Sequence, residues 1–216
     1  MNTKTSVVLS FLLIAVALGT SWGLQAKLPD RMASHWNVQD QADGFMSKRA
    51  AILIMPLVSA AMLGLLLGLP ALDPLKANIA QFRREFNLFV VAIIAFMLYL
   101  HGLTLAWNLG WQTFKMSAAM LPPMGALFIL IGWLLRRAKR NFFIGIRTPW
   151  TLSSDSVWER THQVGGVLFA ACGALAIVGS FFGGAAALWL FLLPMLSSAV
   201  FLVAYSYWLY RREIVA

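Results

Sequence analysis

Six long apolar segments recur along the chain, separated by short polar or glycine-containing stretches. They occupy residues 6–24, 51–69, 88–107, 117–135, 166–182 and 185–209. An α-helix of roughly 17 to 25 apolar residues crosses the hydrocarbon core of a bilayer. The pattern therefore predicts an all-α integral membrane protein, built as a bundle of six transmembrane helices. We expect the first segment to be an uncleaved span, because Leu24-Gln25-Ala26 is a poor signal-peptidase site.

The first polar stretch, residues 25–50, shows a period of two. Ala33, His35 and Asn37 fall on one side of an extended chain, and the residues between them fall on the other. Asp43-Gly44 is a turn signal. We expect a small strand-and-turn cap at the membrane surface.

A second kind of element follows the second apolar segment. Asp73-Pro74 is a favourable helix start, with an acid at the cap and proline at the first position. Apolar residues then recur at helical spacing, and basic residues lie elsewhere on the wheel. The apolar positions are Leu75, Ile79, Phe82 and Phe86, and the basic ones are Lys76, Arg83 and Arg84. We expect residues 74–86 to form one helix in the interface, with its basic side toward lipid headgroups.

A polar island separates the fourth and fifth apolar segments. Ser156 and Glu159 have the spacing of a capping box, which predicts a short helix that begins there or slightly before. On that helix Asp155, Trp158 and His162 would share one face. The next segment carries small residues four apart, which we expect to pack closely on a neighbouring helix. These small residues are Gly166, Ala170 and Ala174.

Composition agrees with a membrane protein. Hydrophobic residues make up 60% of the chain and charged residues 12%, whereas a soluble domain averages about 25% charged residues. The net charge of +9 is scattered over short loops, which argues against nucleic-acid binding. The single cysteine, Cys172, lies in an apolar segment and can form no disulfide within the chain.

The distribution of Lys and Arg predicts the orientation. With six spans, the side that holds both termini receives 12 of these residues and the other side receives 5. The positive-inside rule then places both termini in the cytoplasm, an N-in/C-in arrangement. The cap around His35 would be extracytoplasmic, and the interfacial helix and the polar island would be cytoplasmic.

Two sequence segments resemble a known family. The polar island contains Gly145-Ile-Arg-Thr-Pro-Trp-Thr-Leu-Ser, followed by Trp158-Glu-Arg-Thr-His162 and Gly165-Gly166. These motifs resemble the signature of the SdpI family. Its members are bacterial membrane proteins named for immunity to a secreted killing peptide, the sporulation-delaying toxin. The first polar stretch contains Leu28-Pro-Asp-Arg-Met-Ala-Ser-His35-Trp-Asn37, followed by Asp43-Gly44-Phe45 and Lys48. These residues resemble the extracytoplasmic domain of unknown function that precedes the SdpI region. The family usually has Gly at the position of Asp40, and Asp tolerates the left-handed turn that Gly would provide.

The resemblance and the hydrophobic pattern together predict three parts. Residues 1–70 would form a helical hairpin whose loop, residues 25–50, belongs to the domain of unknown function. Residues 71–87 would form the interfacial helix. Residues 88–216 would form an SdpI-like four-helix membrane domain with a cytoplasmic motif loop at residues 136–166.

Candidate binding residues lie in both polar loops. The extracytoplasmic set could bind a peptide, a lipid headgroup or a metal, or could form a hydrogen-bonded cap over the bundle; it comprises His35, Asn37, Asp43, Gly44 and Lys48. The cytoplasmic set recurs in the family pattern and comprises Asn141, Gly145, Arg147, Thr148, Trp150, Asp155, Trp158 and His162. It could bind a partner protein or a small ligand, with Arg147 gripping a carboxylate or phosphate. The alternative is structural, with Arg147 paired to Asp155 or Glu159.

His101 is an ionisable residue within the third apolar segment, where such residues mark functional sites or bond to a neighbouring helix. We expect no cofactor and no metal, because no HExxH or CxxC spacing is present. Catalytic residues are not indicated either, since no nucleophile has an evident His partner.

The resemblance implies a multi-pass protein of the bacterial inner membrane that gives immunity to a secreted toxic peptide. It also implies a signalling role in which the cytoplasmic loop binds a regulator protein. Membrane lipids would be its other partners. The alternative is a transporter or a membrane-embedded enzyme acting on a lipid or small solute. A hydrated, polar cavity at His101 would favour that alternative, and a dry, apolar interior would favour binding and immunity.

Overall fold

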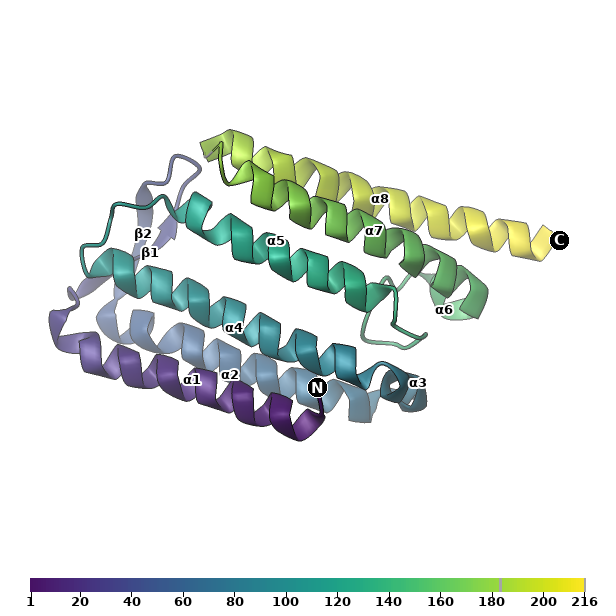
Figure 1. The fold of residues 1–216 in the computed structure, drawn as a ribbon, viewed down its shortest axis with the longest axis horizontal. Helices are drawn as coiled ribbons and strands as arrows, with labels where there is room; N and C mark the ends of the chain where they lie inside the picture. The colour runs from purple at the N-terminus through teal and green to yellow at the C-terminus, as the bar shows by residue number, and fades with distance from the viewer. Residues whose placement is uncertain (183, 216) are drawn as a thin grey trace.

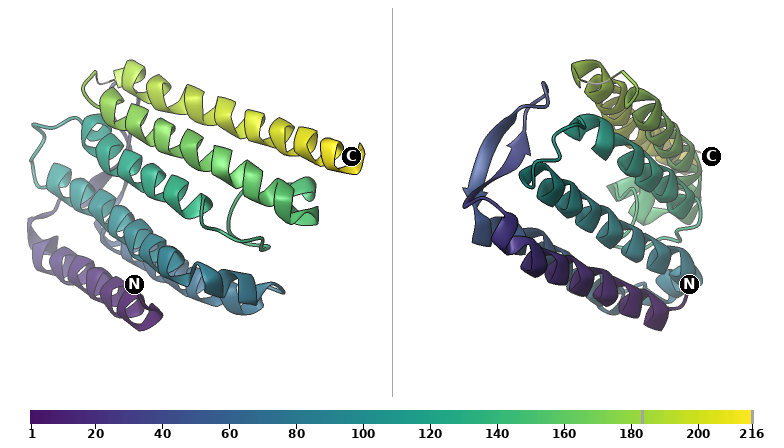
Figure 2. Two further views of the ribbon diagram at one scale, coloured as in Figure 1. Left: turned by 45° about the vertical axis from the view of Figure 1, so that its right-hand side comes forward. Right: turned by 60° about the vertical axis from the view of Figure 1, so that its left-hand side comes forward.

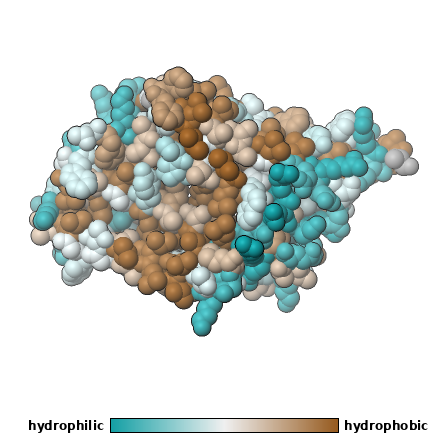
Figure 3. Space-filling model, in the orientation of Figure 1, coloured by the Kyte–Doolittle hydropathy of each residue, from teal (hydrophilic) through white to brown (hydrophobic). Residues whose placement is uncertain are grey.

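The computed structural model describes residues 1–182 and 184–215. Six helices in these ranges are long and apolar enough to cross a membrane, which confirms the six-helix prediction. They are α1 (Thr3–Leu24), α2 (Lys48–Leu72), α4 (Arg83–Asn108), α5 (Met116–Leu135), α7 (Asp155–Gly179) and α8 (Gly184–Val215). Hydrophobic residues form a band across the middle of the face in Figure 3, and the strongest hydrophilic colour gathers toward the end that carries the C-terminus.

The helices form two groups of three. Helices α1, α2 and α4 contact one another, and α7 packs against both α5 and α8 (Figure 1). Helices α4 and α5 lie side by side and join the two groups. The largest cluster of buried hydrophobic residues lies at one end of the contact between the two groups. It includes Phe86 and Val90 of α4 together with Leu134 and Trp158.

The two ends of the bundle differ. One end carries both termini, the short helices α3 (Lys76–Gln81) and α6 (Pro149–Ser153), and the loop between α5 and α6; we call it the motif end. The other end carries the β-hairpin of β1 (Arg31–Trp36) and β2 (Ala42–Ser47), and we call it the hairpin end (Figure 2). The two candidate sets of the sequence analysis therefore lie at opposite ends of the helices.

Close helix packing is concentrated between α5 and α7. A Cβ on Gly125 would meet the carbonyl oxygen of Gly173, and one on Gly132 would meet the carbonyl oxygen of Gly166 and lie 3.0 Å from the Ala170 nitrogen. The prediction of a small-residue face is thus confirmed at Gly166 and Ala170. It was wrong at the third position, since Ala174 is exposed and Gly173 makes the contact instead.

The strand-and-turn cap is confirmed as a two-stranded antiparallel hairpin, preceded by a 3₁₀ turn at Gln25–Lys27. The predicted turn at Asp43-Gly44 was wrong, because both residues lie in β2 and Gly44 is paired with His35. The chain turns at residues 37–41 instead, where Asp40 has a φ of +60°. Asp40 therefore takes the left-handed conformation expected at that position.

The expected single helix over residues 74–86 is divided. Helix α3 ends at Gln81, Phe82 has the non-helical angles φ −122° and ψ 26°, and α4 begins at Arg83. The apolar stripe nevertheless faces inward, because Ile79, Phe82 and Phe86 are each 1% exposed. Burial of Phe82 at the break lets α3 fold back over the end of the bundle. Its placement in a lipid interface stays a prediction.

Candidate functional site

At the hairpin end, two of the candidate residues form an exposed pair. Nδ1 of His35 lies 2.5 Å from a carboxylate oxygen of Asp43, across the two strands. Gly44 makes the approach possible, because a Cβ at this position would lie 2.8 Å from the His35 Cβ. Gly44 therefore has a packing role beside the pair.

The other two candidates at this end also make structural contacts. The side-chain oxygen of Asn37 accepts hydrogen bonds from the backbone N–H groups of Gln39 and Gln41, both at 3.0 Å, and so fixes the turn. The ammonium of Lys48 lies 3.1 Å from the carboxylate of Asp30, which joins the start of α2 to the approach of β1. These contacts agree with the hydrogen-bonded cap that was one of the two alternatives.

The hairpin is fastened to both groups of helices by residues that the sequence analysis did not select. One carboxylate oxygen of Asp40 accepts from the backbone N–H of Ser117 and the other from its hydroxyl, both at 2.7 Å. The amide of Asn108 accepts from the N–H of Ala33 at 2.8 Å and donates to its carbonyl at 3.0 Å. The sequence indicated these contacts only through polar residues at the ends of two apolar segments, namely Asn108 and Ser117.

The Asp40–Ser117 contact should stabilise the closed hairpin measurably. Asp40→Asn removes the charge while preserving the shape, and Ser117→Ala removes only the hydroxyl donor. We expect each change to destabilise by about 1.5–3 kcal/mol, the size of a hydrogen bond to a charged group. In a double-mutant cycle by thermal unfolding, the combined loss should be smaller than the sum of the two single losses. Additive losses would show that the two side chains do not interact.

A cavity of about 340 Å³ lies beneath the hairpin. Its walls come from β1 and the turn, from α2, α4 and α5, and from the first residues of α8. Three methionines contribute to the wall, namely Met55, Met116 and Met120. Because methionine is flexible and polarizable, such a wall adapts to apolar groups of different shape.

At the motif end, Asn141 organises the loop that follows α5. Its side-chain oxygen accepts from the N–H groups of Phe143 and Ile144 at 2.9 and 2.6 Å. Its amide nitrogen donates to the carbonyls of Lys139 and Ile144 at 2.8 and 2.9 Å. Asn141 is fully buried, so this candidate shapes the loop from inside.

Trp158 and His162 are stacked on one face of α7, with ring centroids 3.9 Å apart, as the predicted helical spacing requires. The indole N–H of Trp158 donates to the carbonyl of Ala138 at 2.8 Å. Nε2 of His162 accepts from the N–H of Ile146 at 3.0 Å, and Nδ1 lies 2.8 Å from the carbonyl of Trp158. Because Nε2 accepts and Nδ1 must donate, both nitrogens are used by a neutral imidazole.

Gly145 is required where the loop passes this pair. Its φ of +120° lies in a region that residues with side chains rarely adopt, and a Cβ would collide with Nε2 of His162. Gly145 therefore lets the backbone approach the ring closely enough for the Ile146 hydrogen bond.

Thr148 and Trp150 attach the segment to α8. Thr148 caps α6 in a reciprocal capping box with Thr151, and its hydroxyl lies 3.0 Å from that of Ser206. The ring of Trp150 packs on Tyr207 with 5.0 Å between centroids. These two candidates therefore connect the motif segment to the last helix.

The ion pair offered as the structural alternative for Arg147 is not formed. Its guanidinium donates to the carbonyl of Phe142 at 2.6 Å, whereas Asp155 accepts from Nε of Arg140 at 2.7 Å. Arg140 reaches Asp155 because a second nitrogen of its guanidinium also donates to the carbonyl of Leu152. Arg147 remains exposed.

The predicted capping box at Ser156 and Glu159 was also wrong. The residue that caps α7 is Ser154, whose hydroxyl accepts from the N–H of Val157 at 3.2 Å. The helix then continues without a break to Gly179, so the expected short helix is the first part of a spanning helix. Its start is slightly before Ser156, as expected.

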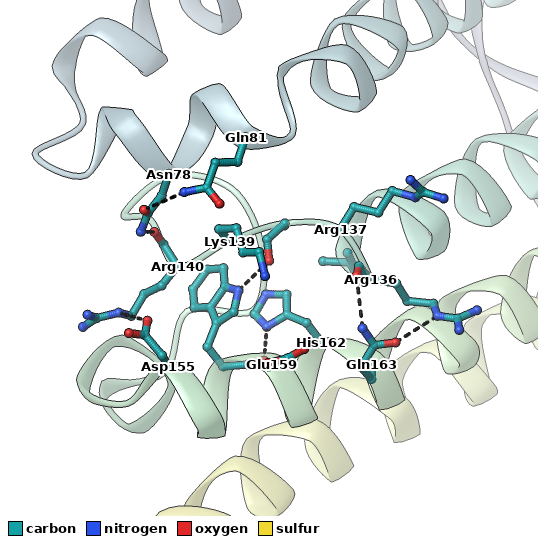
Figure 4. Close-up of a pocket in the computed structure, with 13 residues that line it drawn as sticks. Asn78, Gln81, Arg136, Arg137, Lys139, Arg140, Asp155, Glu159, His162 and Gln163 are labelled. Carbon is teal, nitrogen blue, oxygen red and sulfur yellow. Dashed lines mark hydrogen bonds and ion pairs between the residues drawn. The ribbon is translucent and has the colours of Figure 1, made fainter.

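A cavity of about 240 Å³ opens between α3, the end of α5 and the start of α7 (Figure 4). His162 lies near its centre, with the Arg140–Asp155 pair at one edge and Arg136 with Gln163 at the other. Of the candidate set, only Asp155, Trp158 and His162 line it; the other members do not. The wall contains four basic residues and two acidic ones, which suits an anionic group.

His101 is buried at 2% exposure, with Nε2 2.7 Å from the hydroxyl of Ser21. It touches a cavity of about 270 Å³ between α1 and α4 whose wall is mainly apolar. This arrangement matches the alternative of a histidine bonded to a neighbouring helix. Among residues 1–182 and 184–215, no group of three or more His, Cys, Asp or Glu side chains is arranged to hold a metal ion.

Comparison with known proteins identifies relatives of the chain. Residues 137–206 match the model of the SdpI/YfhL protein family, and residues 11–60 match a domain of unknown function, DUF1648. The chain is 25% identical over 205 residues to the immunity protein SdpI of Bacillus subtilis (strain 168), which covers 95% of this chain and 96% of the relative. No solved structure matches the chain. The matches to both motif-bearing segments confirm the resemblance to the SdpI family, and together with the six spans they support a multi-pass protein of a bacterial membrane.

Proposed function

We propose that this protein gives its cell immunity to a secreted toxic peptide. The observation that carries the proposal is similarity to an immunity protein along nearly the whole of both chains. The protein would act by binding the peptide at the hairpin end, where the fold provides a cavity under an exposed cap. Such protection requires binding only and no chemical step.

The orientation is part of this proposal. The hairpin end would face outward and the motif end the cytoplasm, as the excess of Lys and Arg at the motif end predicts. Single cysteines placed at Gln39 and at Ser153 in a Cys172→Ser background should react differently with a membrane-impermeant maleimide on intact cells. We expect labelling at residue 39 only. Equal labelling of both positions would contradict the orientation.

A signalling role at the motif end would extend this function. The buried candidates Asn141 and His162 hold the segment's shape, while Arg147 and Phe142 are exposed beside each other, joined by the 2.6 Å hydrogen bond. An exposed arginine and an exposed phenylalanine in one loop are suited to contact with a partner protein. We propose that a cytoplasmic regulator binds there.

The observations at His101 argue against a transporter or an embedded enzyme. Transport of a polar solute requires polar groups along a path through the bundle, and the cavity next to His101 is lined mainly by apolar side chains. The Ser21 contact gives the imidazole a structural role between α1 and α4. Binding and immunity therefore remain the better supported function.

The test is a resistance assay in a bacterium that is sensitive to the sporulation-delaying toxin. Expression of the chain should raise the inhibitory toxin concentration. His35→Ala should reduce that protection, because it removes an imidazole that lines the cavity at the hairpin end. Arg147→Ala should leave protection intact but abolish any toxin-dependent change in reporter genes, because it acts at the opposite end. Unchanged sensitivity on expression of the wild-type chain at verified membrane levels would refute the immunity proposal.

A further inference from the structure

A residue that lines the cavity beneath the hairpin carries an unused hydrogen-bond donor. Trp36 lines the cavity, and its indole N–H is buried without an acceptor among the described residues. Its aromatic neighbour Trp107, with ring centroids 5.6 Å apart and an interplanar angle of 77°, supplies no oxygen or nitrogen acceptor. A buried donor without a partner costs free energy, and a bound group that supplies an acceptor recovers it.

The charges around the cavity restrict what that acceptor can be. Among the described residues that line it, none is Lys or Arg. The carboxylate of Asp40 is already engaged by both donors of Ser117, and His35 is engaged by Asp43. With no cation to balance it, a ligand carboxylate or phosphate would be disfavoured next to Asp40. The acceptor that fits is neutral, such as a peptide carbonyl.

The remainder of the wall is suited to an apolar group. Leu100 of α4, Met120 of α5 and Leu188 of α8 converge on the cavity from three helices. A volume of about 340 Å³ accommodates one or two large apolar side chains. A lipid acyl chain would fill the same space but has no acceptor along its length for the Trp36 N–H.

We infer that this cavity binds an apolar segment of a peptide, with side chains among the methionines and a backbone carbonyl accepting from the indole N–H of Trp36. The inference rests on the proposed immunity function and names its ligand-binding site. It also assigns to the hairpin the role of a cover, since β1 supplies Trp36 and the turn supplies Asp40.

Two substitutions test the hydrogen-bond donor and the apolar wall of the site, and a third serves as the control for the wall. Trp36→Phe preserves an aromatic ring and removes the N–H. Leu188→Trp fills the cavity, whereas Leu196→Trp makes the same change on the same helix at a side chain that is 57% exposed outside the cavity. Purified proteins in phosphatidylcholine nanodiscs would be titrated with fluorescently labelled sporulation-delaying toxin peptide, and the same variants would be assayed for resistance.

We expect the Kd to rise about fivefold or more in Trp36→Phe, the loss of one neutral hydrogen bond. It should rise at least about tenfold in Leu188→Trp and should be unchanged in Leu196→Trp. The melting temperature of each variant separates lost binding from lost folding.

The outcomes separate the two proposals. Binding that is weakened as expected supports the site. Binding that is unaffected by both cavity variants overturns the site while immunity stands, and unaffected binding in Trp36→Phe alone overturns the carbonyl contact. Resistance without binding also overturns the site, because protection then operates elsewhere. Binding without resistance supports the site and refutes immunity, and the absence of both refutes both.

Discussion

Gly132→Leu is expected to cause the largest loss of stability of any single substitution considered for this protein. There is no space for a side chain at this position, because the backbone of α7 at Gly166 and Ala170 lies against it. Backbone atoms cannot rotate away as a side chain can, so α5 and α7 would have to separate along their whole contact. Overpacking of this kind costs about 3 kcal/mol or more.

The measurement is thermal unfolding in detergent, followed by the loss of the monodisperse peak in size-exclusion chromatography. For a protein of this size we expect the apparent Tm to fall by roughly 6–12 °C. Gly64→Leu is the matched control, since a Cβ at Gly64 meets nothing within 4 Å. An equal fall in both variants would mean that leucine is poorly tolerated in the bundle generally, and would contradict a specific α5–α7 contact.

Gly145→Ala should have the second largest effect, and this effect should be local to the motif end. A residue with a Cβ at φ +120° is strained by about 1–3 kcal/mol. The same Cβ collides with His162, so the hydrogen bond from Ile146 is lost, at a further cost of about 1 kcal/mol. We expect the loop at residues 138–148 to detach from the Trp158–His162 pair.

Hydrogen–deuterium exchange provides the measurement for Gly145→Ala. Exchange of the Ile146 and Ile144 amides should increase, while amides of the hairpin remain protected. His162→Gln serves as a comparison, because glutamine retains an acceptor but loses the stacked ring. If exchange rises equally at both ends of the bundle, the substitution has destabilised the whole protein and the local account is wrong.

The spans and the cap could be predicted from the sequence because each depends on local patterns. Twenty apolar residues have few alternatives to a helix in a membrane, and alternation around His35 specifies a strand. The turn could not be placed, because Asp43-Gly44 fits two environments: a turn, and a strand position opposite the bulk of His35. The choice between them is made by tertiary packing.

The contacts that hold the candidate residues were largely beyond sequence reasoning. Pairing of Arg147 with Asp155 or Glu159 was one alternative suggested by charge, but opposite charge does not specify distance, and Arg140 reaches Asp155 instead. Likewise Ser154 takes the place of Ser156 as the cap of α7, because α6 ends at Ser153 and α7 begins two residues earlier than the capping pattern indicates. That Trp158 and His162 share one face of α7 was predictable from helical spacing, whereas their stacking also depends on the loop contacts of the two rings.

The attachment of the hairpin turn to α5 has a consequence for biosynthesis. Asp40 and Ser117 are 77 residues apart in the chain, so at a translation rate of about 5–20 residues per second the turn exists for roughly 4 to 15 seconds before its partner is made. During that interval the rest of the hairpin, α2, α3 and α4 are made, but there is no α5 to receive the Asp40 carboxylate. The cover over the cavity therefore cannot be fastened through this contact until Ser117 has been made, when just over half of the chain has been synthesised.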